Sequence, residues 1–259
     1  RGVNERDMWS TSLKLDFDTG AGTFTSVTAY DHLDELLTGD QFNFLPIAES
    51  VWSLFGIPPD QAQHQWLDVD AFSQEVRFSS PSDRRLRWIA GAYLILTDRF
   101  ISTGNVSDLG DGIVPAVKRT PLPQWSFGSF DPVARQQTFL ADSQDNTAYA
   151  FFGEASYDVT DRLEASFALR YDNDERENTT ETPNAFIPAL IQGMALQGQV
   201  RKETWDDLQP KFTLRFQPNE DWTLYGGYSR GFRSGGFNQT GVGRARIGGI
   251  GGLVGQGTA

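Results

Sequence analysis

Alternation of apolar and polar residues is the feature of this sequence that most restricts its fold. It is clearest from Tyr149 to Tyr171, a stretch with a predicted turn at residues 158–161. After the turn, apolar residues occupy every second position, and mostly charged or small polar residues stand between them. A repeat of two residues is that of a β-strand with one apolar and one polar face. The stretch therefore predicts an antiparallel hairpin.

The register of this hairpin follows from keeping like faces together. Tyr157 is predicted to face Leu163, and Gly153 then faces Phe167. A slip by one residue would set Glu154 among apolar neighbours, because such a shift turns a whole strand face over. In this register the ring of Phe167 covers the bare backbone of Gly153, an arrangement that stabilises sheets.

Three further pairs of alternating stretches bring the predicted strands to eight, and their connections alternate strictly between short and long. Short turns are predicted at residues 19–22, 81–85, 158–161 and 218–221, and long connections at residues 40–65, 104–143 and 182–199. In an up-and-down antiparallel sheet, all short turns then lie at one end and all long loops at the other, as in outer-membrane barrels. The predicted fold class is therefore all-β: an antiparallel transmembrane β-barrel segment of about eight long strands, with short periplasmic turns and long extracellular loops.

Aromatic residues recur beside the short turns. Phe17 and Phe24 flank the first turn, and Phe78 and Trp88 flank the second. Such a pattern suits an aromatic girdle at a membrane interface, although aromatic residues also favour strands in soluble cores. The sequence has no run of about 18 apolar residues and so predicts no transmembrane helix. A closed barrel is then the remaining way for the chain to cross lipid.

Composition excludes several classes of function. The chain has 34 Asp plus Glu against 22 Lys plus Arg, a formal net charge of -12, which disfavours nucleic acid as a partner. It has no cysteine, and its two histidines, His32 and His64, are expected to be solvent-exposed loop residues without a role. The carboxylates at residues 172–177 lack the spacing of a calcium loop and are expected in a solvated strand extension. No catalytic motif occurs, so we expect neither enzymatic activity nor a cofactor.

Three segments resemble successive parts of the barrel of TonB-dependent outer-membrane receptors. They are FSQEVRFSSPSDRRLRWIAGAYL, YAFFGEASYDVTDRLEASFALRYD and WTLYGGYSRGFRSGGFN. The resemblance covers most of residues 66–238. Residues 1–65 match only in having similar alternating strands, without a shared motif. It implies a barrel of about 22 strands around an N-terminal plug domain. It also implies uptake of a scarce nutrient, most often a ferric siderophore, with energy from the TonB complex, in the bacterial outer membrane.

The resemblance also predicts how this chain relates to the complete receptor. No plug domain, energy-coupling box or aromatic C-terminal residue is recognised in the sequence. We therefore expect residues 1–238 to be an internal part of the barrel, and the glycine-rich residues 239–259 to form a loop or a loose segment. Surrounding lipid, the plug, the TonB complex and a small-molecule substrate are the partners that the resemblance implies.

Two groups of residues are candidates for contact with a substrate. By alternation, the candidates for lining the lumen are Lys14, Asp16, Glu75, Arg77, Glu154, Glu164, Arg170, Lys211 and Arg215. Their charges also suit pairing with one another and with the plug. The candidates for an external aromatic platform in the long loops are Trp52, Phe55, Trp125, Phe127 and Phe130. These rings also suit packing of the loops upon themselves.

Two other functions fit the same pattern. One is a complete small outer-membrane protein with a structural or adhesive role, since eight strands are enough for a closed barrel. The other is a soluble β-barrel that binds a small ligand, in which case the apolar faces point inward.

Overall fold

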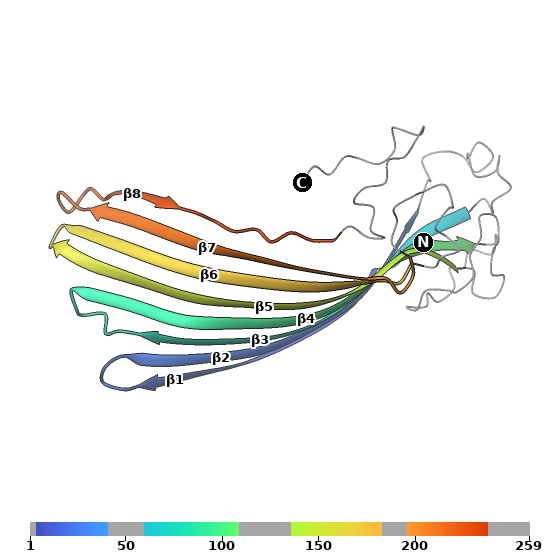
Figure 1. Cartoon of the computed structure of the whole chain (residues 1–259), viewed down its shortest axis with the longest axis horizontal. Coiled ribbons are helices and arrows are strands. Elements are labelled where there is room, and N and C mark those ends of the chain that lie inside the picture. Colours follow the sequence, from blue (N-terminus) through green and yellow to red (C-terminus); the bar gives the residue numbers. More distant parts are fainter. Residues whose placement is uncertain (1–3, 41–59, 109–135, 183–195, 238–259) are drawn as a thin grey trace.

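The computed structural model describes residues 4–40, 60–108, 136–182 and 196–237, which form one antiparallel sheet of eight strands (Figure 1). The strands are β1 (Asn4–Asp18), β2 (Thr23–Asp40), β3 (Asp60–Ser79), β4 (Leu86–Asp108), β5 (Gln136–Thr160), β6 (Leu163–Thr180), β7 (Val200–Phe216) and β8 (Leu224–Ser229). Among these residues no helix is both long and apolar enough to cross a membrane. The predicted all-β fold class is thus confirmed.

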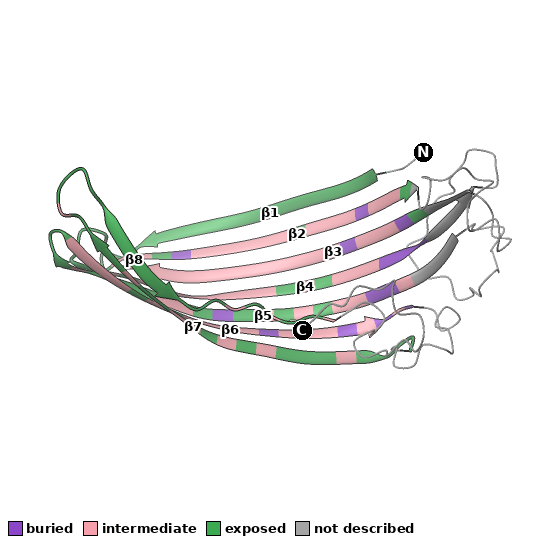
Figure 2. Ribbon diagram, turned by 90° about the horizontal axis from the view of Figure 1, so that it is seen from above, coloured by how far each residue is buried: buried purple, intermediate pink, exposed green. Residues whose placement is uncertain are grey.

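The strands follow one another across the sheet in chain order, from β1 to β8. The turns at residues 19–22, 80–85, 161–162 and 217–223 lie together at one end, and the strand ends that bound the long connections lie at the other (Figure 1). The predicted alternation of connections is therefore confirmed. β1 and β8 form the two edges, so the sheet is open, and β1 is exposed along its whole length (Figure 2). An open sheet argues against a closed barrel made of these eight strands alone.

The strand pairing carries the alternation of the sequence across the whole sheet. Phe17 pairs with Phe24, and Phe24 pairs with Phe78, so the aromatic residues beside the short turns share one face. The rings of Phe78 and Trp88 stack with centroids 5.5 Å apart. We call this side of the sheet the apolar face and the opposite side the polar face.

A second row of aromatic residues lies on the apolar face of β1 to β3, nearer the loop end. Tyr30 pairs with Phe72, and the ring of Trp9 lies 5.0 Å from that of Tyr30. Six residues separate Phe24 from Tyr30, which is about 20 Å along a strand. We call the part of this face between the two groups of aromatic residues the apolar band; in strands tilted by about 35–45° it spans about 15 Å across the membrane. The strands continue beyond this band toward the long connections.

The register of the hairpin formed by β5 and β6 differs from the predicted one. Tyr157 pairs with Ala165 rather than Leu163, and Gly153 pairs with Leu169 rather than Phe167. The predicted turn is two residues too early, because residues 161–162 form the turn and the pairing shifts between residues 158 and 160 at a β-bulge. The error is an even number of residues, so every side chain keeps its predicted face. The proposed covering of Gly153 by the Phe167 ring is wrong.

Single cysteines at opposite ends of the sheet are expected to show which end faces the cell exterior. Gly20→Cys and Asp83→Cys lie in short turns, and Asp60→Cys begins β3 at the loop end. In a cysteine-free form of the natural protein that contains this chain, an impermeant maleimide should label only Asp60→Cys on intact cells. The two turn variants should react after lysis alone. Labelling of both turn variants on intact cells would contradict the predicted orientation.

Candidate functional site

The polar face carries all nine residues that alternation predicts to line a lumen. They are Lys14 and Asp16 in β1, Glu75 and Arg77 in β3, Glu154 in β5, Glu164 and Arg170 in β6, and Lys211 and Arg215 in β7. Their common placement follows from the continuous register of the sheet. That this face lines a lumen remains a prediction.

Ion pairs within single strands brace the polar face. Lys14 Nζ lies 2.9 Å from Asp16 Oδ2, and Arg77 Nη1 lies 2.7 Å from Glu75 Oε1. Both pairs join residues two positions apart, which therefore point to the same side of their strand. The side chains are partly exposed, so each pair contributes about 0–1 kcal/mol to stability. The expected pairing of lumen charges with one another is present at these positions.

A larger charge network ties four strands together near the short turns. Arg87 in β4 lies 2.6 Å from Asp158 in β5 and 2.5 Å from Glu164 in β6. Arg215 in β7 lies 3.3 Å from the same Glu164 carboxylate. Glu164 and Arg215 are among the predicted candidates for lining the lumen, but Arg87 is not. The network links the four strands at the turn end of the polar face. It does not extend to the loop end of that face.

The loop end of the polar face carries two arginines against two aromatic rings. The guanidinium of Arg176 lies 5.8 Å from the centre of the Trp205 ring, and that of Arg201 lies 5.1 Å from the centre of the Phe237 ring. The two rings are 6.0 Å apart. We call these four residues the arginine–aromatic cluster. Cation–π contacts of this kind hold both guanidinium groups in place.

Neighbouring polar groups fix the two arginines further. Arg176 Nη2 donates 2.7 Å hydrogen bonds to Asp174 Oδ2 and to Ser234 Oγ. Arg201 donates to the side-chain oxygen of Asn178, a residue that is 1% exposed. Arg201 is the second residue of β7, well beyond the apolar band, and burial lowers the pKa of its guanidinium. A charge that has lost part of its water interacts more strongly with an anion.

A glycine allows the C-terminal segment to approach the cluster. A Cβ atom at Gly235 would lie 2.6 Å from the ring of Trp205, closer than any real contact. Only glycine therefore lets this segment cross the ring and bring Phe237 beside Trp205.

Sequence reasoning missed the arginine–aromatic cluster and misjudged its surroundings. Asp174, expected in a solvated extension, is 7% exposed and hydrogen-bonded to Arg176. The alternation does place Arg176 and Trp205 on the polar face, but the contact with Phe237 depends on a segment 32 positions further along the chain. A count of arginines and aromatic residues at polar-face positions near the loop ends would have singled out the site.

Both histidines differ from the prediction, because β2 extends to Asp40 and β3 begins at Asp60. His32 lies in β2 with its Nδ1 atom 2.8 Å from Asp70 Oδ1. His64 lies in β3 near its loop end, is fully buried, and has no hydrogen-bond partner on either ring nitrogen. Burial lowers the pKa of His64 to about 4. Neither histidine is the solvent-exposed loop residue that the sequence predicts.

Several predicted features fall outside the described residues. They are the glycine-rich residues 239–259 and the platform candidates Trp52, Phe55, Trp125, Phe127 and Phe130. A ligand platform in the long loops remains a prediction.

Solved structures of outer-membrane receptors share this architecture. The ferric yersiniabactin uptake receptor FyuA from Yersinia pestis matches with a TM-score of 0.57 and 14% identity, over 86% of this chain and 27% of that one. The copper transporter OprC matches with a TM-score of 0.56 and 13% identity, over 88% and 30%. The siderophore receptor PiuA from Acinetobacter baumannii matches with a TM-score of 0.56 and 13% identity, over 88% and 32%. The chain thus spans about a third or less of each of these proteins.

Comparison with protein families gives a match over nearly the whole chain. None of the curated proteins matches it. The family model of the TonB dependent receptor-like β-barrel matches residues 1–258, which includes the N-terminal stretch that resembles such barrels only in strand style. With the open antiparallel sheet and its two unlike faces, this match shows that the chain belongs to the TonB-dependent receptor-like β-barrel family.

Proposed function

We propose that this chain is part of the barrel wall of a bacterial outer-membrane receptor that takes up a small, scarce nutrient, and that its substrate is an anionic iron chelate of the siderophore class. The arginine–aromatic cluster carries this proposal. Arg176 and Arg201 offer fixed donors for the carboxylate or phenolate groups of a chelate. Trp205 and Phe237 offer ring faces for its organic part.

The solved relatives support the substrate class without fixing it. The matching structures include an uptake receptor for ferric yersiniabactin, a ferric citrate transporter, a siderophore receptor and a copper transporter. The loop end of the polar face is the end at which a ligand from outside would first meet the wall. A plug domain inside the complete barrel and the TonB complex as energy source complete the proposed receptor. In this proposal the chain has no catalytic step.

Variants of the arginine–aromatic cluster test the proposal. Arg201→Ala with Trp205→Ala should weaken binding of a ferric chelate by at least about 10-fold, because a hydrogen bond to a charged group contributes roughly 1.5–3 kcal/mol. Binding is measured by isothermal titration calorimetry, which needs no tryptophan reporter, on the natural protein in detergent, and uptake is measured with radiolabelled iron in cells. Arg215→Ala is the matched control, since Arg215 lies on the same face at the turn end.

The test compares the double variant of the arginine–aromatic cluster with the Arg215→Ala control. We expect the cluster variant to lose chelate binding and uptake while the control keeps both. If the unsubstituted protein binds no ferric chelate, the substrate class is wrong. If both variants bind equally well, the cluster does not contact the substrate.

A further inference from the structure

Acidic residues gather on the apolar face just beyond the second aromatic row. At the positions of β1 to β4 that share this face, the sequence places Glu5, Asp7, Asp34, Asp68, Asp70 and Asp98. The same positions of these four strands hold no lysine or arginine. Carboxylates repel one another when they are close together, and a bound cation relieves this repulsion.

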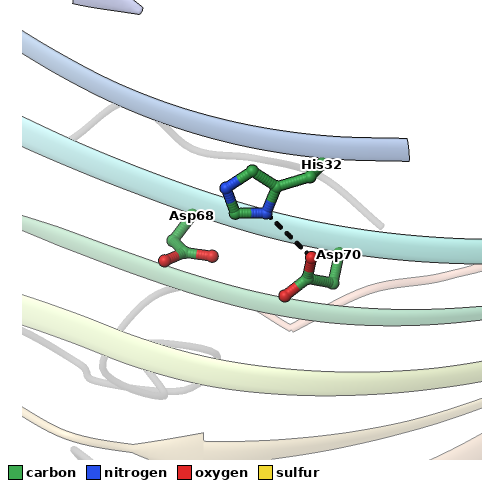
Figure 3. A group of neighbouring side chains, drawn as sticks. All are labelled: His32, Asp68 and Asp70. Atoms are coloured by element: carbon green, nitrogen blue, oxygen red, sulfur yellow. Dashed lines mark hydrogen bonds and ion pairs between the residues drawn. The ribbon is translucent and has the colours of Figure 1, made fainter. Parts of the chain in front are cut away.

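His32, Asp68 and Asp70 form the centre of this acidic region. His32 pairs with Asp70 across β2 and β3, and the strand alternation sets Asp68 on the same side (Figure 3). The ligand atoms of the three side chains all lie within 4.8 Å of one another. Asp68 is 7% exposed, so its carboxylate is held within the wall. The pairing register therefore brings one imidazole and two carboxylates to a common point.

His32 and Asp70 are hydrogen-bonded to each other, so one metal ion can reach both side chains. His32 Nδ1 and Asp70 Oδ1 are 2.8 Å apart. Two ligands of a tetrahedral Zn²⁺, each about 2.0–2.1 Å from the metal, lie about 3.3 Å apart, so this contact widens by about 0.5 Å when the metal replaces the shared proton. Tyr30 OH donates a 2.6 Å hydrogen bond to the same Asp70 oxygen. Such a bond from a neighbouring group orients a ligating carboxylate.

A cavity of about 380 Å³ lies beside His32 and is accessible from outside the wall. Its lining comprises Glu5, Asp7, His32, Asp34, Leu36 and Trp66. The indole Nε1 of Trp66 is buried and has no hydrogen-bond partner in the structure. A buried N–H group without an acceptor suits an oxygen ligand on a bound cation. Glu5, Asp7 and Asp34 thus line the cavity next to His32, whereas Asp68 and Asp70 are not among the residues that line it.

From this geometry we propose that His32, Asp68 and Asp70 bind a divalent first-row transition metal ion on the outside of the barrel wall. One imidazole with two carboxylates is a mixed nitrogen and oxygen donor set, which suits Zn²⁺ better than Mg²⁺ or Ca²⁺. Glu5, Asp7 and Asp34 add negative charge around the ion. The site lies on the loop side of the aromatic residues Trp9 and Tyr30, and on the opposite face from the arginine–aromatic cluster. It is therefore independent of the proposed substrate site.

Zinc binding to the untagged natural protein in detergent tests the site. Isothermal titration with Zn²⁺ should show one saturable site that Asp68→Asn with Asp70→Asn weakens by at least 10-fold. His32→Ala should weaken it similarly, because the nitrogen ligand is lost. Asp31→Asn is the matched control: it makes the same chemical change one residue from His32, but on the polar face. This control should bind Zn²⁺ as the unsubstituted protein does.

Thermal unfolding gives a second measurement. Saturating Zn²⁺ should raise the unfolding midpoint of the unsubstituted protein and of Asp31→Asn, and leave that of the doubly substituted protein unchanged. Mg²⁺ at the same concentration should have a smaller effect. Equal Zn²⁺ affinity in all variants, or the absence of a saturable site in the unsubstituted protein, would overturn the proposal.

Discussion

Arginine in place of Phe167 is expected to destabilise the folded barrel wall by about 2–4 kcal/mol, the usual cost of a cation near the bilayer midplane of an outer-membrane barrel. Phe167 is 52% exposed and lies on the apolar face, midway between Leu163 near the turn and Tyr171 toward the loop end. Its side chain therefore lies in the middle of the apolar stretch of β6. A detergent-to-lipid folding titration of the natural protein measures the change in free energy.

Arginine at the adjacent Ser166 is the matched control. Ser166 lies on the polar face, where its Oγ atom is 2.8 Å from Ser156 Oγ. Ser166→Arg loses this hydrogen bond, which is worth about 0.5–1.5 kcal/mol, but keeps its charge in polar surroundings. If Ser166→Arg costs as much as Phe167→Arg, or more, then the two faces have been assigned to the wrong environments.

Withdrawal of detergent is expected to convert the isolated chain from a monodisperse species into aggregates. Large apolar side chains on the apolar face remain open, with Phe151 58% exposed and Phe212 44% exposed. Such a continuous apolar surface needs lipid or detergent to cover it. The edges β1 and β8 add unpaired backbone groups that can pair with other chains.

Sedimentation velocity across a detergent dilution series measures this transition. Restoring detergent before aggregation should preserve the monodisperse species. A single monomer with cooperative unfolding in plain buffer would contradict the membrane assignment and favour the soluble ligand-binding barrel.

The predictions that depend on local alternation agree with the structure, and those that depend on distant contacts do not. Faces follow from a two-residue repeat, so Glu164 and Phe167 are assigned to opposite sides from the sequence alone. The register at Tyr157 depends on the bulge before the turn, which the composition of the turn does not reveal. The approach of His32 to Asp70 joins residues 38 positions apart and requires the register of β2 and β3.

Burial at the loop end was equally hard to foresee. His64 lies in a stretch with weak alternation and was expected in a loop, but it belongs to a strand and is fully buried. The contact between Trp205 and Phe237 needs Gly235 at the crossing point, and a glycine alone does not indicate which ring lies against it. These features arise from packing between segments that are distant in the sequence. The alternation of residues within one strand carries no information about such packing.

The strictly sequential strand order makes each hairpin a separable unit of the wall. Each of the strands β2 to β7 contacts the strands before and after it in the chain, so a two-strand unit added or removed between neighbours leaves the other pairings intact. Duplication or loss of a hairpin therefore offers a simple evolutionary route to pores of different diameter, since barrel diameter grows with strand number. The same order lets assembly proceed by stepwise addition of hairpins, with each new strand templated by the one that precedes it.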